Sequence, residues 1–299
     1  MQPNQRIRYS PITGRPRLEL PASARVAVWL IVNIEEWNPS EPVPRTVLPP
    51  PAGGSPSPDI PNWAWHEYGN RVGFWRILEV LDNLKIRPAL AINGSVISSY
   101  EPIARAARDR DWEFIGHGFT QKNMQKVPNE REDIVRTTSA IHDFTGRRPR
   151  GWLGPGLTET LETPEILVEE GYEYVCDWVL DDQPVRLSTR SGPIVSMPYT
   201  LECNDVALIS VQHHTAQEYR DRAIHQIDQL LLDAKESARV MALTVHPYLM
   251  GVPHRLRYFQ EAIEYICGRP DIVFWTGARI YDWYVAQIGD PKSDAQRAG

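Results

Sequence analysis

Continuous apolar runs alternate with amphipathic segments along most of this chain. The first run, Val26–Ile34, is apolar or β-branched at nearly every position, as expected for a strand covered on both faces of a parallel sheet. Residues 70–86 instead repeat their apolar positions with helical spacing. By the same criteria, we predict further strands at 88–93, 112–116, 172–177, 193–197, 206–212, 239–245 and 271–275, and a strand or a loop at 151–156. We predict further helices at 101–110, 130–145, 163–170, 255–267 and 278–288, and one that begins at Thr215.

The strand–helix alternation predicts an α/β fold with a parallel sheet. The number of strands and the length of 299 residues favour one barrel, complete or incomplete, over an open doubly wound sheet. We therefore expect a polar N-terminal arm at 1–24, a barrel at 25–290 and a flexible tail at 291–299. Such an arm either packs on a neighbouring subunit or frays. Residues 38–62 contain nine prolines and are predicted as a long loop inserted in the barrel.

Composition and charge narrow the classes of partner. The net charge is −6 and no basic block is present, so we expect no nucleic-acid partner. No apolar run approaches the ~20 residues needed to span a bilayer, and the N-terminus lacks the apolar core of a secretory signal. The three cysteines are widely spaced and predict neither a disulfide framework nor a cysteine zinc site. We expect a cytoplasmic protein with no membrane partner.

Ionisable side chains follow the predicted strands at four places. These side chains are Glu35 with Glu36, His117, Asp177 and His246. In a β/α barrel the C-terminal ends of the strands meet in one bowl. Single polar residues are common there because solvent begins at strand ends, but four together favour a functional site. Two adjacent carboxylates suit a division of labour between a base and an anchor, and a histidine can donate a proton near neutral pH.

These motifs resemble those of the polysaccharide deacetylase (NodB-homology) superfamily. Its first motif is a strand ending in two acidic residues, where this chain has Glu35 and Glu36. Its second is His-x-x-x-His, which reads His117-Gly-Phe-Thr-Gln121 here. Its last is an apolar strand ending in a histidine, here His246. The resemblance implies a single-domain, distorted (β/α)7-type barrel in which Glu35 is the catalytic base and His246 the catalytic acid.

One branch of the superfamily is more closely similar. It contains metal-independent allantoinases, cyclic imide hydrolases and an atypical peptidoglycan deacetylase. The similar segments are 33–36, 67–76, 197–205 and 246–253. The 67–76 segment places Tyr68 and Arg71 among the candidate substrate-binding residues. Because members of this branch form homotetramers, the resemblance also implies a homodimer or homotetramer.

The main departure from the superfamily pattern is Gln121. The metal-dependent members hold their metal with one carboxylate and two histidines, whereas Gln121 leaves only Glu36, His117 and a weak amide oxygen. A catalytic transition metal generally needs three protein ligands. We therefore expect no catalytic metal and no other cofactor. The alternative is a divalent metal at Glu36 and His117 whose third ligand is Asn123, His66 or Glu67.

The favoured function is hydrolysis of a non-peptide C–N bond, by ring-opening of a small cyclic amide such as allantoin, a hydantoin or a cyclic imide. Glu35 would take a proton from water, and His246 would protonate the departing nitrogen or hold the oxyanion. The predicted substrate-binding residues are Glu36, His117, Gln121, Tyr68, Arg71 and Trp178. Arg71 could clamp a carbonyl or carboxylate, or it could form an ion pair at a subunit contact.

Two other functions are compatible with the same scaffold. The first is metal-dependent N-deacetylation of an acetylated sugar or peptidoglycan, which would need a third metal ligand. The second is non-catalytic binding of a carbohydrate or metabolite. The presence of both Glu35 and His246 disfavours a protein that only binds.

Overall fold

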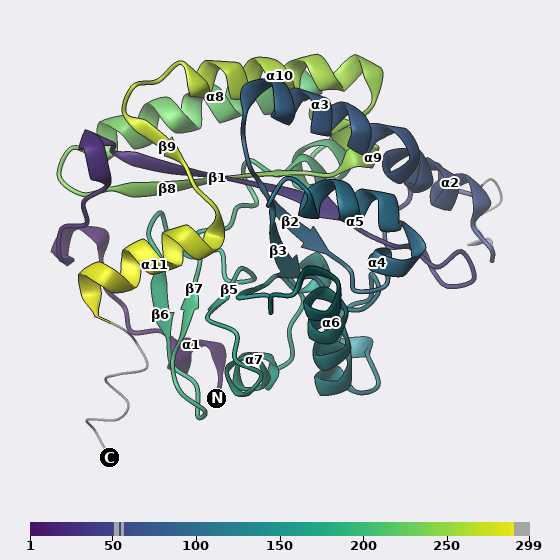
Figure 1. The fold of residues 1–299 in the computed structure, drawn as a ribbon, viewed down its shortest axis with the longest axis horizontal. Helices are drawn as coiled ribbons and strands as arrows, with labels where there is room; N and C mark the ends of the chain where they lie inside the picture. The colour runs from purple at the N-terminus through teal and green to yellow at the C-terminus, as the bar shows by residue number, and fades with distance from the viewer. Residues whose placement is uncertain (51–53, 55–56, 290–299) are drawn as a thin grey trace.

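The computed structural model describes residues 1–50, 54 and 57–289. It contains one curled sheet that is flanked by helices (Figure 1). The strands are β1 (Val26–Ile34), β2 (Ala89–Ile92), β3 (Glu113–Gly116), β4 (Gly151–Trp152), β5 (Tyr174–Val175), β6 (Val185–Leu187), β7 (Ile194–Ser196), β8 (Arg239–Val245) and β9 (Ile272–Phe274). Their order is β6-β7-β5-β4-β3-β2-β1-β8, and β9 pairs with the first residues of β1. Only the β6–β7 pair is antiparallel among these strands. This topology confirms the predicted single-domain, distorted barrel.

Strand β1 is the centre of the fold because it pairs with β8, β2 and β9. All nine of its residues are buried. Val28, Leu30 and Val32 face a core shared with the helices. Trp29 and Ile31 face the interior of the barrel. The unbroken apolar run seen in the sequence therefore reflects burial on both faces.

The helices cover the outside of the sheet, with α3, α8 and α10 on one side of β1 and β8 (Figure 1). They are α1 (Pro3–Arg6), α2 (Ile60–Tyr68), α3 (Phe74–Leu84), α4 (Val96–Ser99), α5 (Glu101–Arg108), α6 (Glu130–Thr145), α7 (Thr163–Glu169), α8 (Ala216–Asp233), α9 (Pro247–Met250), α10 (Pro253–Cys267) and α11 (Gly277–Ile288). Among the described residues, no helix combines the length and apolar character needed to cross a membrane.

The predicted strand at 206–212 is wrong. Residues Val206–Val211 form a π-helical turn, in which the Gln212 amide donates to the Ala207 carbonyl over 3.0 Å. The Asn204 side chain accepts from the Val206 amide at 3.0 Å and so starts the turn. A polar residue that captures a backbone amide in this way competes with strand pairing, although the apolar run itself has strand-like composition.

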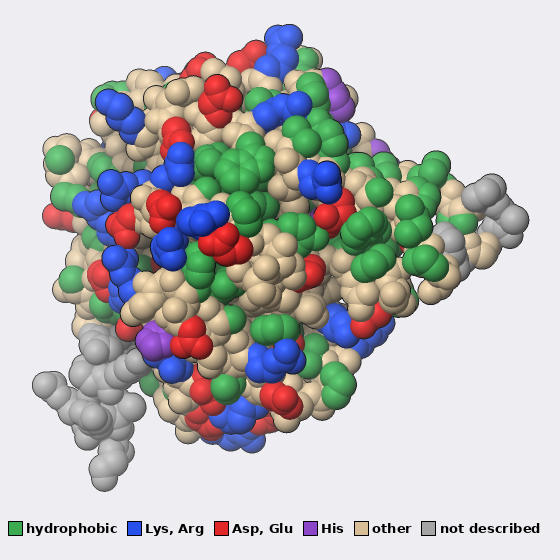
Figure 2. Space-filling model, turned by 45° about the vertical axis from the view of Figure 1, so that its right-hand side comes forward, with side chains coloured by type: hydrophobic (Ala, Val, Ile, Leu, Met, Phe, Trp, Pro, Cys, Tyr) green, Lys and Arg blue, Asp and Glu red, His purple; other side chains and the backbone are tan. Residues whose placement is uncertain are grey.

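The proline-rich insertion is only partly a loop. Helix α2 begins within it at Ile60, because the Asp59 side chain accepts from the Asn62 amide at 3.3 Å and Pro61 suits a first helical turn. The Asn62 side chain also accepts from the Val47 amide at 2.8 Å, which ties the loop to the helix. The insertion projects from the barrel, and apolar side chains lie on the surface around it (Figure 2). One of the insertion's apolar residues, Val47, is 58% exposed.

Helix α2 continues into a π-helical turn, Gly69–Gly73, that packs against α9. A Cβ atom at Gly69 would lie 2.4 Å from the Tyr248 amide nitrogen, and one at Gly73 would lie 2.2 Å from the Pro247 carbonyl oxygen. Glycine is therefore required at both positions by the close approach of two backbones. This contact supports the segment that follows β8.

The N-terminal arm packs on its own barrel. Arg6 is buried and its guanidinium lies 3.1 Å from the Glu165 carboxylate. Leu18 and Leu20 join the core inside the barrel, and the Ala238 amide donates to the Leu18 carbonyl at 2.8 Å. These contacts hold the arm against its own barrel. The predicted tail at 291–299 lies outside the described residues.

Candidate functional site

Three of the predicted residues meet at the C-terminal end of the barrel. Glu35 follows β1, His117 follows β3 and His246 follows β8, and each is at most 5% exposed. They share a cavity of about 180 Å³, whose lining is Asn33, Glu35, Arg45, His117, Leu153, Gly154, Gly156, Leu157, Tyr199, Leu201, Asn204, Val206, Ala207, Val211 and His246. The parallel strands bring these side chains together, as expected for a β/α barrel.

The Glu35 carboxylate is held by donors on both oxygens. Trp37 Nε1 donates to Oε2 at 2.7 Å, and Gln121 Nε2 donates to Oε1 at 2.9 Å. The Asn70 side chain donates to the Glu35 carbonyl at 3.0 Å. The carboxylate is therefore fixed in both position and rotation, as a pre-organised base requires.

Two imidazoles face the same Oε1 atom of Glu35. Its distance to His246 Nε2 is 3.6 Å and its distance to His117 Nε2 is 3.9 Å. His117 Nδ1 lies 2.6 Å from the Leu153 carbonyl. Because a carbonyl only accepts, Nδ1 carries the hydrogen. Burial raises the pKa of Glu35, but His117 and His246 outweigh it and hold that pKa well below its ordinary value. Glu35 is therefore anionic at neutral pH.

Asp205 is a site residue that was not predicted from the sequence. Its Oδ1 lies 2.7 Å from His246 Nδ1 and its Oδ2 accepts from the His246 amide at 2.7 Å. Asp205 is fully buried. A buried carboxylate in this position fixes the tautomer and orientation of a catalytic imidazole, so His246 presents Nε2 to the cavity. The misread strand at 206–212 placed Asp205 at the wrong end of a strand and hid this role.

The residues of the expected metal motif do not fit a catalytic divalent metal. The Gln121 amide uses its nitrogen on Glu35 and its oxygen to accept from Asn93 Nδ2 at 3.1 Å. Glu36 does not line the cavity. Its carboxylate instead contributes to raising the pKa of Tyr100, with burial and Glu67 as the larger causes. Among the described residues, no three His, Cys, Asp or Glu side chains are grouped as metal ligands would be.

Two of the three alternative third ligands, Glu67 and Asn123, use their side chains elsewhere. His66 stacks on Trp37 with ring centroids 4.2 Å apart. Glu67 accepts from the Tyr100 hydroxyl at 2.5 Å. The Asn123 side chain accepts from the Gln125 amide at 2.8 Å. None of the three lines the cavity.

Three further residues that were expected to bind substrate lie outside the cavity lining. The Tyr68 hydroxyl accepts from Arg76 at 2.7 Å. Arg71 lies close enough to Glu67 to contribute to lowering its pKa. Trp178 Nε1 donates to the Glu159 carboxylate at 3.0 Å. Arg45, from the proline-rich insertion, lines the cavity instead. No periodic or motif signal marks an arginine in the irregular part of this insertion.

Asp177, the fourth predicted strand-end residue, forms a carboxyl pair with Glu159, and both residues are half-buried. The Gly154 amide donates to Asp177 Oδ1 at 2.7 Å. The remaining oxygens, Asp177 Oδ2 and Glu159 Oε1, are buried and have no other partner among the described residues. Burial raises the pKa of Glu159 to about 7 and, together with the charge of Glu159, raises that of Asp177 well above its usual range. The pair therefore holds a shared proton, as two adjacent buried carboxyls must.

This pair should make stability depend on pH. The pKa of Glu159 is about 7 in the folded protein against an ordinary 4.5, so the folded state binds more protons than the unfolded state between those values. The free energy of unfolding should consequently fall as pH rises through this range. The pKa difference corresponds to about 3 kcal/mol. Glu159→Gln keeps a hydrogen-bonding partner for Asp177 but cannot titrate, so its free energy of unfolding should fall less.

Urea denaturation of both proteins at several pH values measures this difference. Glu162→Gln is a matched control, because Glu162 lies in the same segment but is exposed and pairs with Arg190. The free energies of unfolding of wild type and Glu159→Gln should diverge as pH rises. Those of wild type and Glu162→Gln should change in parallel. Parallel curves for all three proteins would contradict a shared proton.

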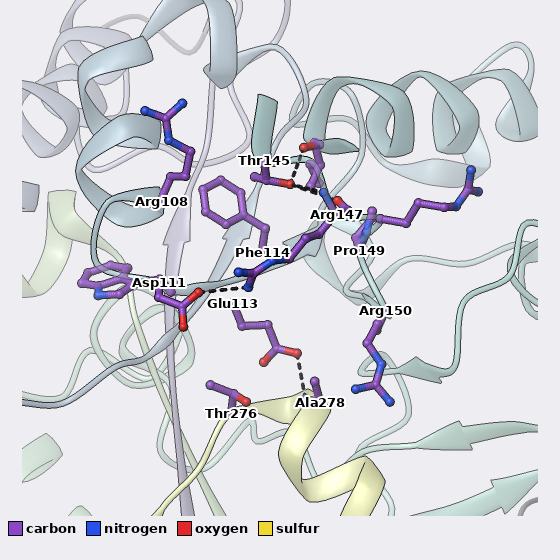
Figure 3. Close-up of a pocket in the computed structure, with 13 residues that line it drawn as sticks. Arg108, Asp111, Glu113, Phe114, Thr145, Arg147, Pro149, Arg150, Thr276 and Ala278 are labelled. Atoms are coloured by element: carbon purple, nitrogen blue, oxygen red, sulfur yellow. Dashed lines mark hydrogen bonds and ion pairs between the residues drawn. The ribbon is translucent and has the colours of Figure 1, made fainter. Parts of the chain in front are cut away.

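A second cavity lies at the opposite end of the barrel, where β3 and β4 begin (Figure 3). It has a volume of about 350 Å³, but its charged side chains are already partnered. Arg147 donates to Asp111 at 2.9 Å, and Arg150 donates to Asp282 at 2.5 Å. The Glu113 carboxylate accepts from the first amides of α11, at 2.6 and 2.7 Å, which satisfies the start of that helix. We therefore assign this cavity a structural role.

Comparison with known proteins shows which family and which fold the chain is similar to. Residues 65–175 match the family model described as polysaccharide deacetylase. A Schizosaccharomyces pombe protein provisionally named a polysaccharide deacetylase is 25% identical over 87% of this chain and 89% of its own length. A Helicobacter pylori peptidoglycan deacetylase is 21% identical over 72% of this chain and 83% of its own. The crystal structure of PuuE allantoinase has a TM-score of 0.81 at 24% identity, covering 91% of this chain and 94% of that one.

The family match includes β2, β3 and His117, and the two relatives extend the similarity over most of the chain. The allantoinase structure shows the same fold. Residues 65–175 therefore match the polysaccharide deacetylase (NodB-homology) domain, which is typical of hydrolases that cleave C–N bonds.

Proposed function

We propose that this protein hydrolyses a small cyclic amide, such as a cyclic imide, a hydantoin or allantoin, without a catalytic metal. The observation that carries the proposal is the hydrogen bond from Gln121 Nε2 to Glu35 Oε1. At the position where a histidine would complete a metal site, this chain has an amide that orients the base.

The size of the cavity supports a small substrate. Its volume of about 180 Å³ is below the roughly 300–1,000 Å³ of typical ligand pockets. Apolar side chains from Leu153, Leu157 and Val206 contribute to its wall. A flat ring with carbonyl oxygens matches a small cavity that combines apolar walls with a few polar groups.

The proposed reaction uses only side chains of this chain. Glu35 takes a proton from water as the water oxygen adds to the ring carbonyl carbon. His246, held by Asp205, donates its Nε2 proton to the ring nitrogen as the C–N bond breaks. An imide or hydantoin nitrogen is a better leaving group than a plain amide nitrogen, because its negative charge is delocalised onto a second carbonyl. His117 helps to position the water or the ring through Nε2.

Deacetylation of an N-acetylated sugar or peptidoglycan is the second candidate. It is favoured by the name of the Helicobacter pylori relative. It would place an acetamido carbonyl beside the same Glu35 and His246. Non-catalytic binding has no comparable support, because Glu35, His246 and Asp205 form a connected array of potential proton donors and acceptors.

One assay separates these candidates. Purified protein, before and after exhaustive chelation, is given succinimide, hydantoin, allantoin and an N-acetylglucosamine oligomer, and its metal content is measured by elemental analysis. We expect ring-opening of at least one cyclic amide at an unchanged rate after chelation. Release of acetate that is lost on chelation and restored by a divalent metal would support the deacetylase instead. Binding without turnover of any compound would support the non-catalytic alternative.

A further inference from the structure

Ring-opening needs a group that holds the negative charge on the reacting carbonyl oxygen, and this inference rests on the proposed function. Oxyanion stabilisation is commonly the largest single contribution to such reactions. In many hydrolases a metal or a pair of backbone amides supplies it. The chain must supply an equivalent donor from the residues around the cavity.

Most donors in the cavity wall or directly behind it are already committed. Gln121 Nε2 donates to Glu35 at 2.9 Å. The Gly154 amide donates to Asp177 at 2.7 Å. Asn33 Nδ2 lies 3.5 Å from the Val245 carbonyl, and Asn204 Nδ2 lies 3.5 Å from the Tyr199 hydroxyl. Redirecting any of them would leave a buried partner unsatisfied.

Arg45 is the exception. Among the described residues that line this cavity, it is the only lysine or arginine. Its Nε is buried without a hydrogen-bond partner among the described residues, and no carboxylate there forms an ion pair with it. Burial lowers the pKa of Arg45, but the charges of Tyr248, Glu35 and Asp205 and a hydrogen bond with the Tyr248 side chain together raise it, so the guanidinium is charged. A charged, half-buried group without an ion-pair partner in an open cavity is suited to an anionic ligand atom.

We propose that Arg45 binds the carbonyl oxygen that becomes part of the carboxylate of the ring-opened product. Water adds to the carbonyl carbon and loses a proton to Glu35, and the carbonyl π electrons move to the oxygen that Arg45 holds. When the C–N bond breaks, its electron pair goes to nitrogen, which takes a proton from His246. The carboxylic acid that forms gives its proton to the now neutral His246, and Glu35 releases its proton to solvent. The product is then a carboxylate beside the guanidinium, with a neutral amide or ureido group at the other end.

Arg45→Gln and Arg45→Lys test this assignment. With succinimide as substrate, Arg45→Gln should lower kcat about 10²–10³-fold and change KM much less, because the charge develops only in the transition state. Arg45→Lys should recover part of the loss. Arg87→Gln is the matched control, because Arg87 is exposed at the other end of the barrel. Thermal unfolding and near-UV circular dichroism show whether each variant is folded.

A binding measurement keeps the assignment testable if the substrate class is wrong. Succinamate, the ring-opened form of succinimide, carries the predicted carboxylate, and calorimetry gives its affinity without any turnover. We expect binding to wild type and to Arg87→Gln, and at least about tenfold weaker binding to folded Arg45→Gln. If wild type opens no imide or hydantoin but shows this binding pattern, the proposed reaction fails and the role of Arg45 as a carboxylate-binding residue stands. Equal succinamate affinity in wild type and Arg45→Gln, or no binding to wild type, overturns the role of Arg45.

Discussion

Glu35→Gln should lower kcat by about 10²–10⁴-fold, the usual contribution of a positioned general base. The substitution keeps a side chain of the same shape between Trp37 and Gln121, and its amide oxygen can still accept one of their hydrogen bonds. It removes only the ability to take a proton from water. Steady-state kinetics on whichever cyclic amide the wild type opens will measure the loss.

Glu36→Gln is the matched comparison, because Glu36 is the next residue but does not line the cavity. We expect a loss of less than about tenfold for that variant. A Glu35→Gln enzyme with wild-type kcat would rule out Glu35 as the base. The pH profile adds a second check. The lowered pKa of Glu35 keeps its carboxylate ionised well below its ordinary value of 4.5, so any loss of activity between about pH 7 and pH 5 must come from another group.

Asp205→Asn should also lower kcat by about 10²–10⁴-fold, with a smaller change in KM. Asparagine fits the same buried space, but its amide can donate to His246 Nδ1 and so favour the tautomer with the hydrogen on Nε2. The imidazole also loses the negative charge 2.7 Å from its Nδ1, which balances the positive charge of the acid form. His246 would then be oriented almost as before but would be a poorer proton donor.

Asp205 acts through His246 and does not line the cavity, so its test needs a measurement that a purely structural role would not move. The upper pH limit of kcat/KM should fall in Asp205→Asn relative to wild type, because the positively charged imidazole has lost its carboxylate partner. An unchanged pH profile with an intact fold would show that Asp205 only supports the loop. Asp181→Asn is a suitable control, because Asp181 forms a partly exposed ion pair with Arg15.

The sequence predicted the parts of the site that strands position. Glu35, His117 and His246 each end a strand with a strong apolar pattern, and parallel strands carry their last residues to one end of a barrel. The barrel itself followed from the same alternation. The prediction of a small-ring hydrolase depended on resemblance, and the departure at Gln121 acquires a physical role in the structure through its bond to Glu35.

The parts that were missed depend on contacts that no local pattern encodes. Asp205 ends the 197–205 segment that resembles related enzymes, but its contact with His246 became visible only when Val206–Val211 proved to be a turn. Arg45 reaches the cavity from a loop whose path is set by tertiary contacts, such as the one between Asn62 and Val47. Tyr68 and Arg71 lie in a segment that resembles related enzymes, but its glycines serve backbone packing against α9.

That backbone packing has a consequence for altering the substrate range. Gly69 and Gly73 contact Tyr248 and Pro247 too closely to admit any side chain, so a library that varies them would mostly return proteins with a displaced His246 loop. The opposite rim of the cavity should accept substitutions. Leu201 and Val211 line it and are 46% and 63% exposed, so new side chains there can change the entrance while the array around Glu35 keeps its geometry.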